Sequence, residues 1–167
     1  MYYADATAVS EQGYVPYAWQ FRDETLGVPS QRGRRLNLFG IYSRANHFHY
    51  WTTPERIDAD YVIAVLDAFS WKIRRPTVLV LDNASPHRNG KVRALLKVWQ
   101  RRGLYLFYLP PYSPQLNPIE RLWQEIKSRY LQAEDYTSAD HLFYALNQVC
   151  AAVGSDIVLN WKDIGSS

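Results

Sequence analysis

Three carboxylates fall at positions from which they could act together on a phosphodiester. Asp5 ends a short predicted strand, Asp82 ends the most apolar predicted strand, and Glu120 lies in the first turn of a predicted helix. Thirty-seven residues lie between Asp82 and Glu120, enough for a helix, a strand and a loop that return the chain to the same place. We therefore expect the three side chains to form one site.

Oxygen ligands of this kind suit Mg²⁺, which keeps several waters and needs few protein ligands. Two such ions, about 3.5–4 Å apart, can activate an attacking oxygen and stabilise a leaving oxygen in phosphoryl transfer. We expect Asp5 to bridge the ions, because its strand is predicted to be central. Asp82 and Glu120 would each hold one side.

Each acid also has a purely structural explanation. Glu120 stands three residues after Asn117, so Asn-Pro-Ile-Glu matches a capping box that would use the carboxylate at the helix start. Asp82-Asn83 could be a turn after a strand, and Asp5 alone is a weak signal. The spacing by itself leaves these explanations open.

Apolar periodicity and turn residues predict the elements that must position the acids. The expected strands cover residues 2–6, 35–42, 47–52, 77–82 and 104–109, with an irregular segment over 10–34 that carries Trp19. The expected helices start at the cap Thr53 with Pro54, at Ser85-Pro86, at Pro118 and near Ser138, and the first two end near Arg75 and at Gly103.

The inward face of each expected helix follows from the same periodicity. It carries Ile57, Tyr61, Ala64, Val65 and Ala68 in the first helix, Val92, Leu95, Leu96 and Trp99 in the second, Ile119, Leu122, Trp123 and Ile126 in the third, and Leu142, Phe143, Leu146 and Val149 in the last. The element order predicts a mixed α/β fold in which an antiparallel hairpin leads into parallel strands. Active sites of such sheets lie at the carboxyl ends of the central strands.

Composition bounds the class of protein. The 167 residues suit a single domain over 1–167, and an apolar content of 47% argues against disorder. No apolar run is long enough for a membrane span, so we expect a cytoplasmic protein. The single cysteine, Cys150, lies on an apolar helical pattern and is expected in the core. A net charge of +3 permits nucleic-acid binding without requiring it.

Two motifs carry a family resemblance. Residues 81–87, Leu-Asp-Asn-Ala-Ser-Pro-His, and residues 109–123, Leu-Pro-Pro-Tyr-Ser-Pro-Gln-Leu-Asn-Pro-Ile-Glu-Arg-Leu-Trp, resemble the second-acid and third-acid motifs of mariner-type DDE transposases of bacterial insertion sequences. A weaker match runs from Tyr3 through Trp19 and over residues 34–40. The resemblance covers about residues 2–131.

The resemblance implies an RNase H-like fold, a mixed sheet flanked by helices, with Asp5, Asp82 and Glu120 as catalytic and metal-binding residues. It implies Mg²⁺ or Mn²⁺, two ions, and cleavage and joining of DNA strands at insertion-sequence ends. It also implies a homodimer or larger assembly on DNA, with the protein associated with the nucleoid when bound. The helix-turn-helix DNA-binding domain that normally precedes such a domain is expected to be absent.

Further residues of the two motifs and the helix that follows are expected to orient the acids or contact DNA: Asn83, His87, Tyr112, Ser113, Asn117, Arg121 and Lys127. His87 could lie at the metal site or be a polar residue in the first turn of a helix. Tyr112 could stack on an unpaired base or pack under the Pro-rich loop. Arg121 and Lys127 could contact phosphates or be exposed helix charges.

Two rival interpretations follow from the same residues. A non-catalytic DNA-binding or assembly remnant with the same fold is suggested by the expected absence of a recognition domain. Ala6 also favours it, because the family often has Glu at that position. A host nuclease with the same triad explains the long motif after Leu109 less well.

Overall fold

The computed structural model describes residues 1–11, 33–110 and 116–161. Its strands and longer helices, in chain order, are β1 (Tyr2–Ser10), β2 (Arg35–Tyr42), β3 (Phe48–Thr53), α1 (Ala59–Lys72), β4 (Thr77–Leu81), α2 (Gly90–Arg101), β5 (Leu104–Tyr108), α3 (Pro118–Glu125) and α4 (Ala139–Ala152). A π-helical turn, η2 (Ile126–Tyr130), and a 3₁₀ helix, η3 (Ala133–Thr137), connect α3 to α4. None of these helices is long and apolar enough to cross a membrane.

The five strands form one mixed sheet in the order β3-β2-β1-β4-β5. β1 pairs antiparallel with β2, which pairs antiparallel with β3, whereas β1–β4 and β4–β5 are parallel. The predicted combination of an antiparallel hairpin with parallel strands is therefore confirmed. β1, which carries Asp5, is the central strand.

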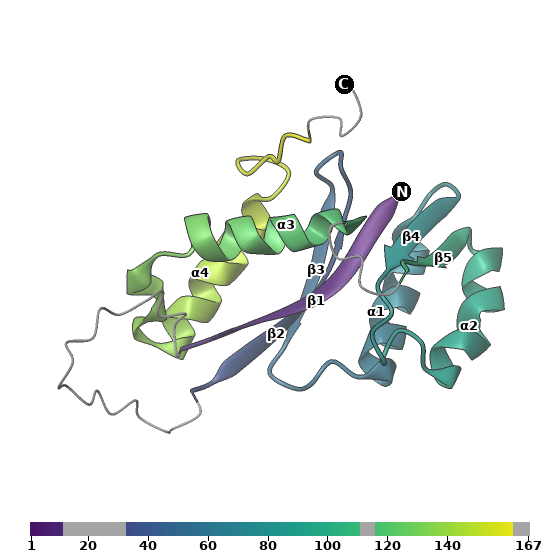
Figure 1. Cartoon of the computed structure of the whole chain (residues 1–167), viewed down its shortest axis with the longest axis horizontal. Helices are drawn as coiled ribbons and strands as arrows, with labels where there is room; N and C mark the ends of the chain where they lie inside the picture. The colour runs from purple at the N-terminus through teal and green to yellow at the C-terminus, as the bar shows by residue number, and fades with distance from the viewer. Residues whose placement is uncertain (12–32, 111–115, 162–167) are drawn as a thin grey trace.

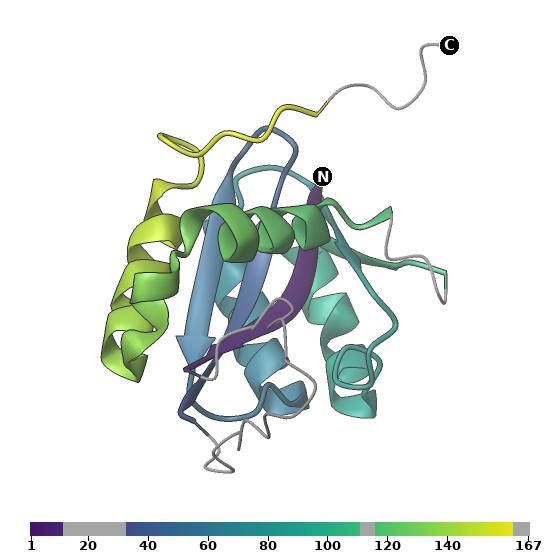
Figure 2. The ribbon, with the colours of Figure 1, turned by 60° about the vertical axis from the view of Figure 1, so that its left-hand side comes forward.

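Helices cover both faces of the sheet. Tyr3, Leu38 and Val80 belong to the core under α3 and α4, whereas their strand neighbours Ala4 and Phe39 belong to the core under α1 and α2. The change of face from one residue to the next is the pleat of a strand buried on both sides. Figure 2 shows α3 and α4 in front of the sheet and α1 and α2 behind it, and Figure 1 shows the same layers from another side.

The first strand is longer than the sequence predicted. β1 does not end at Asp5 but continues to Ser10, because β2 pairs with it from Tyr3–Tyr42 as far as Ser10–Arg35. Its parallel pairing with β4 stops earlier, at Ala4–Leu81. On the side of β2, Asp5 therefore lies within the paired part of β1. On the side of β4, it lies just after the last parallel pair.

The start predicted for the first helix is wrong. Thr53 stays in β3, paired with Asn37, and α1 begins at Ala59 with Asp58 as its cap. The Asp58 side chain accepts a hydrogen bond from the Tyr61 backbone N–H at 2.9 Å. Pairing with β2 therefore outweighs the local Thr-Pro start signal.

The end and the inward face predicted for this helix also need correction. α1 ends at Lys72, before Arg75. Its buried residues include Val62, Val65 and Leu66, whereas Ala64 and Ala68 are exposed. The inward stripe is rotated toward the larger apolar side chains, because these bury more area against the sheet.

The start predicted for the second helix is also wrong. Residues 85–88 form a turn, and α2 begins at Gly90, where the side chain of the cap Asn89 accepts from the Lys91 N–H at 3.0 Å. The inward stripe is confirmed, with Val92 and Trp99 fully buried and Leu95 and Leu96 partly buried. Gly103 ends the helix with φ of 89°, a conformation that favours glycine.

The last two helices agree with the sequence. In α3 and η2 the side chains of Ile119, Leu122, Trp123 and Ile126 are buried as predicted. α4 begins after the cap Ser138, and Leu142, Leu146 and Cys150 are buried while Phe143 and Val149 pack beside them. Trp19 lies outside the described residues.

Candidate active site

The backbone brings the two aspartates side by side. Ala4 of β1 pairs with Leu81 of β4, and this is the last pair of the two parallel strands. Asp5 and Asp82 follow directly after it, at the same level of the sheet. Tyr3 and Val80, two residues before each aspartate, belong to the core under α3. By strand alternation, both carboxylates project from the face that α3 covers.

Glu120 reaches the same place from above the sheet. It lies in the first turn of α3, whose buried residues Ile119, Leu122 and Trp123 pack onto that face. Asn117 caps the helix without a side-chain hydrogen bond, so the alternative capping box is not formed. The Glu120 carboxylate is therefore not used to cap its own helix.

The pKa values of Asp5 and Glu120 depend on the charges of neighbouring acids of the triad. The pKa of Asp5 is raised from 3.8 to about 6; burial is the largest cause, the charges of Asp82 and Glu120 add to it, and the Ala6 N–H and the charge of His87 oppose it. Burial and the charge of Asp82 also raise the pKa of Glu120. The three carboxylates that the sequence singled out therefore lie within electrostatic reach of one another, and their role as one metal site stays a prediction.

Asp82 is held differently from the other two acids. Burial raises its pKa, but hydrogen bonds to its Oδ1 from His87 Nδ1 at 2.5 Å and from the Ala84 N–H at 3.0 Å outweigh burial, and the pKa is lowered overall. The bond to Ala84 is the turn that the sequence offered as an alternative for Asp82-Asn83. This turn coexists with the carboxylate site and fixes the orientation of Asp82.

His87 lies in the turn after β4, and its side chain is only 3% exposed. The ring packs edge-on against Phe39, with centroids 5.7 Å apart. The ring is hydrogen-bonded to Asp82, and the role of His87 at a metal site stays a prediction. Its position in a helix was predicted wrongly.

The carboxylate oxygens of Asp5, Asp82 and Glu120 suit a divalent cation, although the three side chains do not surround a common point closely. Within residues 1–11, 33–110 and 116–161, no three His, Cys, Asp or Glu side chains are grouped closely enough to hold an ion. Carboxylates repel one another when no cation lies between them, and the raised pKa values of Asp5 and Glu120 are the signature of that repulsion together with burial. Hard oxygen ligands with excess negative charge match Mg²⁺ or Mn²⁺.

Two asparagines tie the surrounding loops together. The Asn83 side-chain amide donates to the Leu109 carbonyl, which links the ends of β4 and β5. Asn117 is 3% exposed, and its amide donates to the Ala4 carbonyl at 3.4 Å, immediately before Asp5. Both residues hold the site in place, and Asn117 is buried away from any DNA surface.

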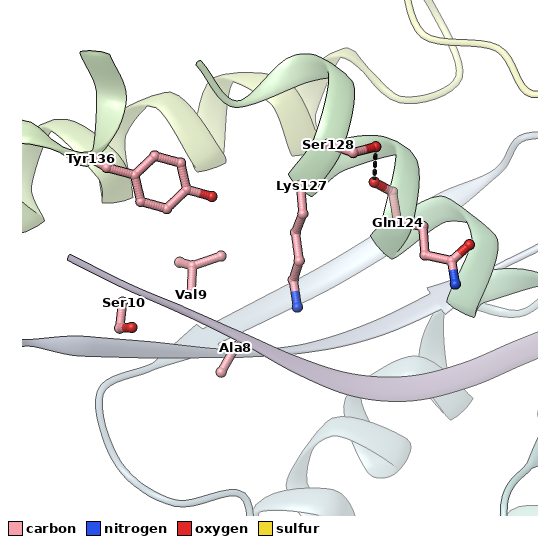
Figure 3. Close-up of a pocket in the computed structure, with 7 residues that line it drawn as sticks. All are labelled: Ala8, Val9, Ser10, Gln124, Lys127, Ser128 and Tyr136. Carbon is pink, nitrogen blue, oxygen red and sulfur yellow. Dashed lines mark hydrogen bonds between the residues drawn. The ribbon is translucent and has the colours of Figure 1, made fainter. Parts of the chain in front are cut away.

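Lys127 lies near Asp5, beside Thr7 of the same strand. Its Nζ donates to Thr7 Oγ1 at 2.5 Å. Lys127 also lines a cavity of about 520 Å³ together with residues of β1, α3 and the segment that follows α3 (Figure 3). Burial lowers the pKa of Lys127, while the charge of Asp5 raises it and that of Arg35 lowers it. The ammonium group therefore sits within electrostatic reach of the site.

The remaining expected contacts are less closely tied to the carboxylates. Arg121 lies over the Trp161 ring, with its guanidinium carbon 5.3 Å from the ring centroid. Tyr112 and Ser113 lie outside the described residues. The roles assigned to these three residues stay predictions.

Gly40 is a positioning residue that was not predicted from the sequence. It pairs with Asp5 across β1 and β2, and a Cβ added there would lie 2.6 Å from the Trp123 ring and 2.9 Å from the Ile119 side chain. Only glycine lets α3 approach the sheet this closely beside Asp5. Glycine inside an apolar strand is the sequence signal for such an approach.

Comparison with known proteins assigns the family. Residues 1–142 match the family of the DDE superfamily endonucleases, and the chain belongs to that family. The chain is also similar to the transposable element Tc1 transposase of Caenorhabditis elegans, with 34% identity over 86 residues, which are 52% of this chain and 30% of that protein. The resemblance to mariner-type DDE transposases is thereby confirmed.

A second relative and a solved structure extend the comparison. The uncharacterized protein y4pE/y4sA of Sinorhizobium fredii (strain NBRC 101917 / NGR234) is 31% identical over 85 residues, 51% of this chain and 56% of that protein. The Mos1 mariner paired end complex with Mn has a TM-score of 0.63 at 16% identity, over 90% of this chain and 48% of that one. The fold is RNase H-like, as expected. The matched regions span about half or less of these proteins.

Proposed function

We propose that this chain is the catalytic domain of a transposase that cleaves DNA strands and joins them to target DNA at the ends of an insertion sequence. The observation that carries the proposal is the placement of Asp5 and Asp82 directly after the paired residues Ala4 and Leu81, on the face where α3 packs with Glu120 in its first turn. Membership of the DDE superfamily endonucleases supports it. The catalytic roles of the three acids are part of the proposal.

Asp5, Asp82 and Glu120 would hold the metal, Mg²⁺ or Mn²⁺, as two ions. Such ions activate the attacking oxygen and stabilise the leaving oxygen of a phosphodiester. Asp5 is the candidate bridging ligand, since it lies on the central strand of the sheet. The Mos1 mariner paired end complex, which is a complex with Mn, supports the choice of metal.

The protein residues contribute positioning and charge. His87 and the Ala84 N–H fix Oδ1 of Asp82, so the carboxylate keeps one orientation and stays ionised. Glu120, in the first turn of α3, would supply the third carboxylate, and Gly40 allows α3 to approach the sheet beside Asp5. Lys127 provides a cation beside Asp5 that could hold a non-bridging phosphate oxygen.

DNA is the proposed partner, both as element ends and as target, bound by a homodimer or larger assembly. The Mos1 structure supports this, since it is a paired end complex of a mariner protein with a similar fold. We propose that residues 1–167 act as one catalytic domain and work where the chromosome is accessible, in the cytoplasm.

A supercoiled plasmid tests the activity without knowledge of the end sequence. With Mn²⁺ or Mg²⁺ the wild-type chain should nick the plasmid, and chelation should abolish nicking. Asp82→Asn should lower the rate by about 100-fold or more, because it removes charge at the metal site. Asp140→Asn is the matched control, since Asp140 lies on the surface, paired with Arg34.

Equal rates for the wild-type chain and Asp82→Asn would refute catalysis by this site. If salt-sensitive DNA binding then persisted after substitution of all three acids, the chain would instead be a DNA-binding remnant with the same fold.

A further inference from the structure

A basic hollow of about 530 Å³ adjoins the catalytic turn near the α2 side of the sheet. It is lined by Asn83, Arg88, Arg93, Leu96 and Tyr108. Asn83 directly follows Asp82, so the hollow and the carboxylate site share one short segment of chain. Neither the two arginines nor Tyr108 belongs to the carboxylate site.

The two arginines of the hollow have no acidic partner among the described residues. Arg102, at the end of α2, pairs with Asp67 at 2.5 Å, whereas neither Arg88 nor Arg93 forms an ion pair in residues 1–11, 33–110 and 116–161. Both are exposed. Two guanidinium groups around one hollow repel each other, and a bound anion would relieve that repulsion.

Both guanidinium groups act on the same phenol. Burial raises the pKa of Tyr108, and the charges of Arg93 and Arg88 lower it, which places both cations near its hydroxyl. That hydroxyl donates to the His87 carbonyl at 2.9 Å. The side chain of the same His87 bonds to Asp82, so the hollow and the carboxylates are held in a fixed relation.

The backbone also anchors the two arginines. The Arg88 N–H donates to the Ala84 carbonyl at 3.3 Å within the turn, and the Arg93 N–H donates to the Asn89 carbonyl at 3.1 Å at the start of α2. Both side chains that line the hollow thus start from hydrogen-bonded turns of backbone. Guanidinium groups in this arrangement match the planar, two-pronged recognition of a phosphate.

We propose that this hollow binds one backbone phosphate of a DNA strand. The neighbouring phosphate of the same strand would lie at Asp5, Asp82 and Glu120. The inference rests on the proposed function and extends it to a second contact on the same strand. A phosphate contact positions the DNA and carries no sequence information. Arg88 and Arg93 would therefore fix the register of the strand for any sequence.

Binding of a fluorescent 20-base-pair duplex in metal-free buffer tests the proposal independently of cleavage. The double substitution Arg88→Gln/Arg93→Gln should weaken binding and lower the slope of log K against log salt by about 1, since one phosphate contact is lost. Lys97→Gln/Arg101→Gln is the matched control, because it removes two exposed cations of the same helix that do not line the hollow. Equal losses in the two variants, or no measurable binding by the wild-type chain, would overturn the proposal.

Arginine modification by phenylglyoxal, followed peptide by peptide, needs no substitution. The duplex should slow modification of Arg88 and Arg93 at least about fivefold and leave Arg74 and Arg101 unchanged, whereas inorganic phosphate at the same ionic strength should protect neither pair. Protection by inorganic phosphate alone would identify a free-anion site and contradict a DNA contact. Both measurements omit metal, so their results can be interpreted even if the chain does not cleave DNA.

Discussion

His87 Nδ1 lies 2.5 Å from Asp82 Oδ1, with the histidine side chain 3% exposed and the aspartate side chain 41% exposed. The pair joins a buried donor to a carboxylate at the surface. Both hydrogen bonds that described residues give to Asp82 end on Oδ1. His87 therefore orients Asp82 from the protein side and leaves the carboxylate facing the site.

His87→Ala should weaken metal binding more than it unfolds the protein. Loss of a hydrogen bond to a metal ligand typically lowers metal affinity by about 10–100-fold, while the buried bond itself contributes about 1–3 kcal/mol to stability. Mn²⁺ titration by electron paramagnetic resonance and urea unfolding measure the two effects. His47→Ala is the control, because His47 is exposed. Unchanged Mn²⁺ affinity in His87→Ala would refute the orienting role.

Gly40→Ala should displace α3 and with it Glu120. The new Cβ would lie 2.6 Å from the Trp123 ring, and such overpacking typically costs about 1–3 kcal/mol. We expect a lower urea midpoint and slower plasmid nicking. Gly90→Ala is the control, since nothing lies within 4 Å of its added Cβ. If the two variants were equally stable and active, the close approach of α3 would not position the site.

Asp5→Asn should stabilise the metal-free protein above about pH 6. The folded-state pKa of Asp5 is raised, so the wild-type chain loses stability as pH rises from 3.8 toward about 6, where the carboxylate ionises in a buried, negatively charged place. The full effect is about 3 kcal/mol, the free energy of moving a pKa from 3.8 to about 6. Below about pH 4 the two proteins should be equally stable.

Urea unfolding in EDTA at several pH values measures this difference, and Mn²⁺ should reverse it by stabilising only the wild-type chain. Asp140→Asn, on the surface, should change stability by about 0.5 kcal/mol or less at every pH. A destabilised Asp5→Asn at pH 8 would show that the Asp5 carboxylate is not strained in the metal-free fold.

Much of the sheet could be predicted because local and global signals agree there. The strand over 35–42 and the inward residues of α3 follow from apolar periodicity and match the structure. The sequence predicts that Asp82 and Glu120 lie near each other, because the apolar residues of the elements that carry them fix how these elements pack. Family resemblance then supplied Asp5, which spacing alone supported weakly.

The starts of the first two helices could not be predicted because tertiary contacts override local signals. Ser85-Pro86 is a good start signal, yet the turn that brings His87 back to Asp82 delays α2 to Gly90. At Thr53-Pro54, pairing of β3 with β2 likewise overrides the local signal for a helix start. The basic hollow was missed for a similar reason, since Arg88 and Tyr108 meet only once β4 and β5 are paired.

Anomalous scattering from crystals soaked in Mn²⁺ tests the proposed metal site most directly. We predict anomalous peaks between the carboxylates of Asp5, Asp82 and Glu120, and their loss in crystals of Asp82→Asn soaked in the same way. Wild-type crystals without a peak at these three side chains, or with a peak that persists in Asp82→Asn, would contradict the account.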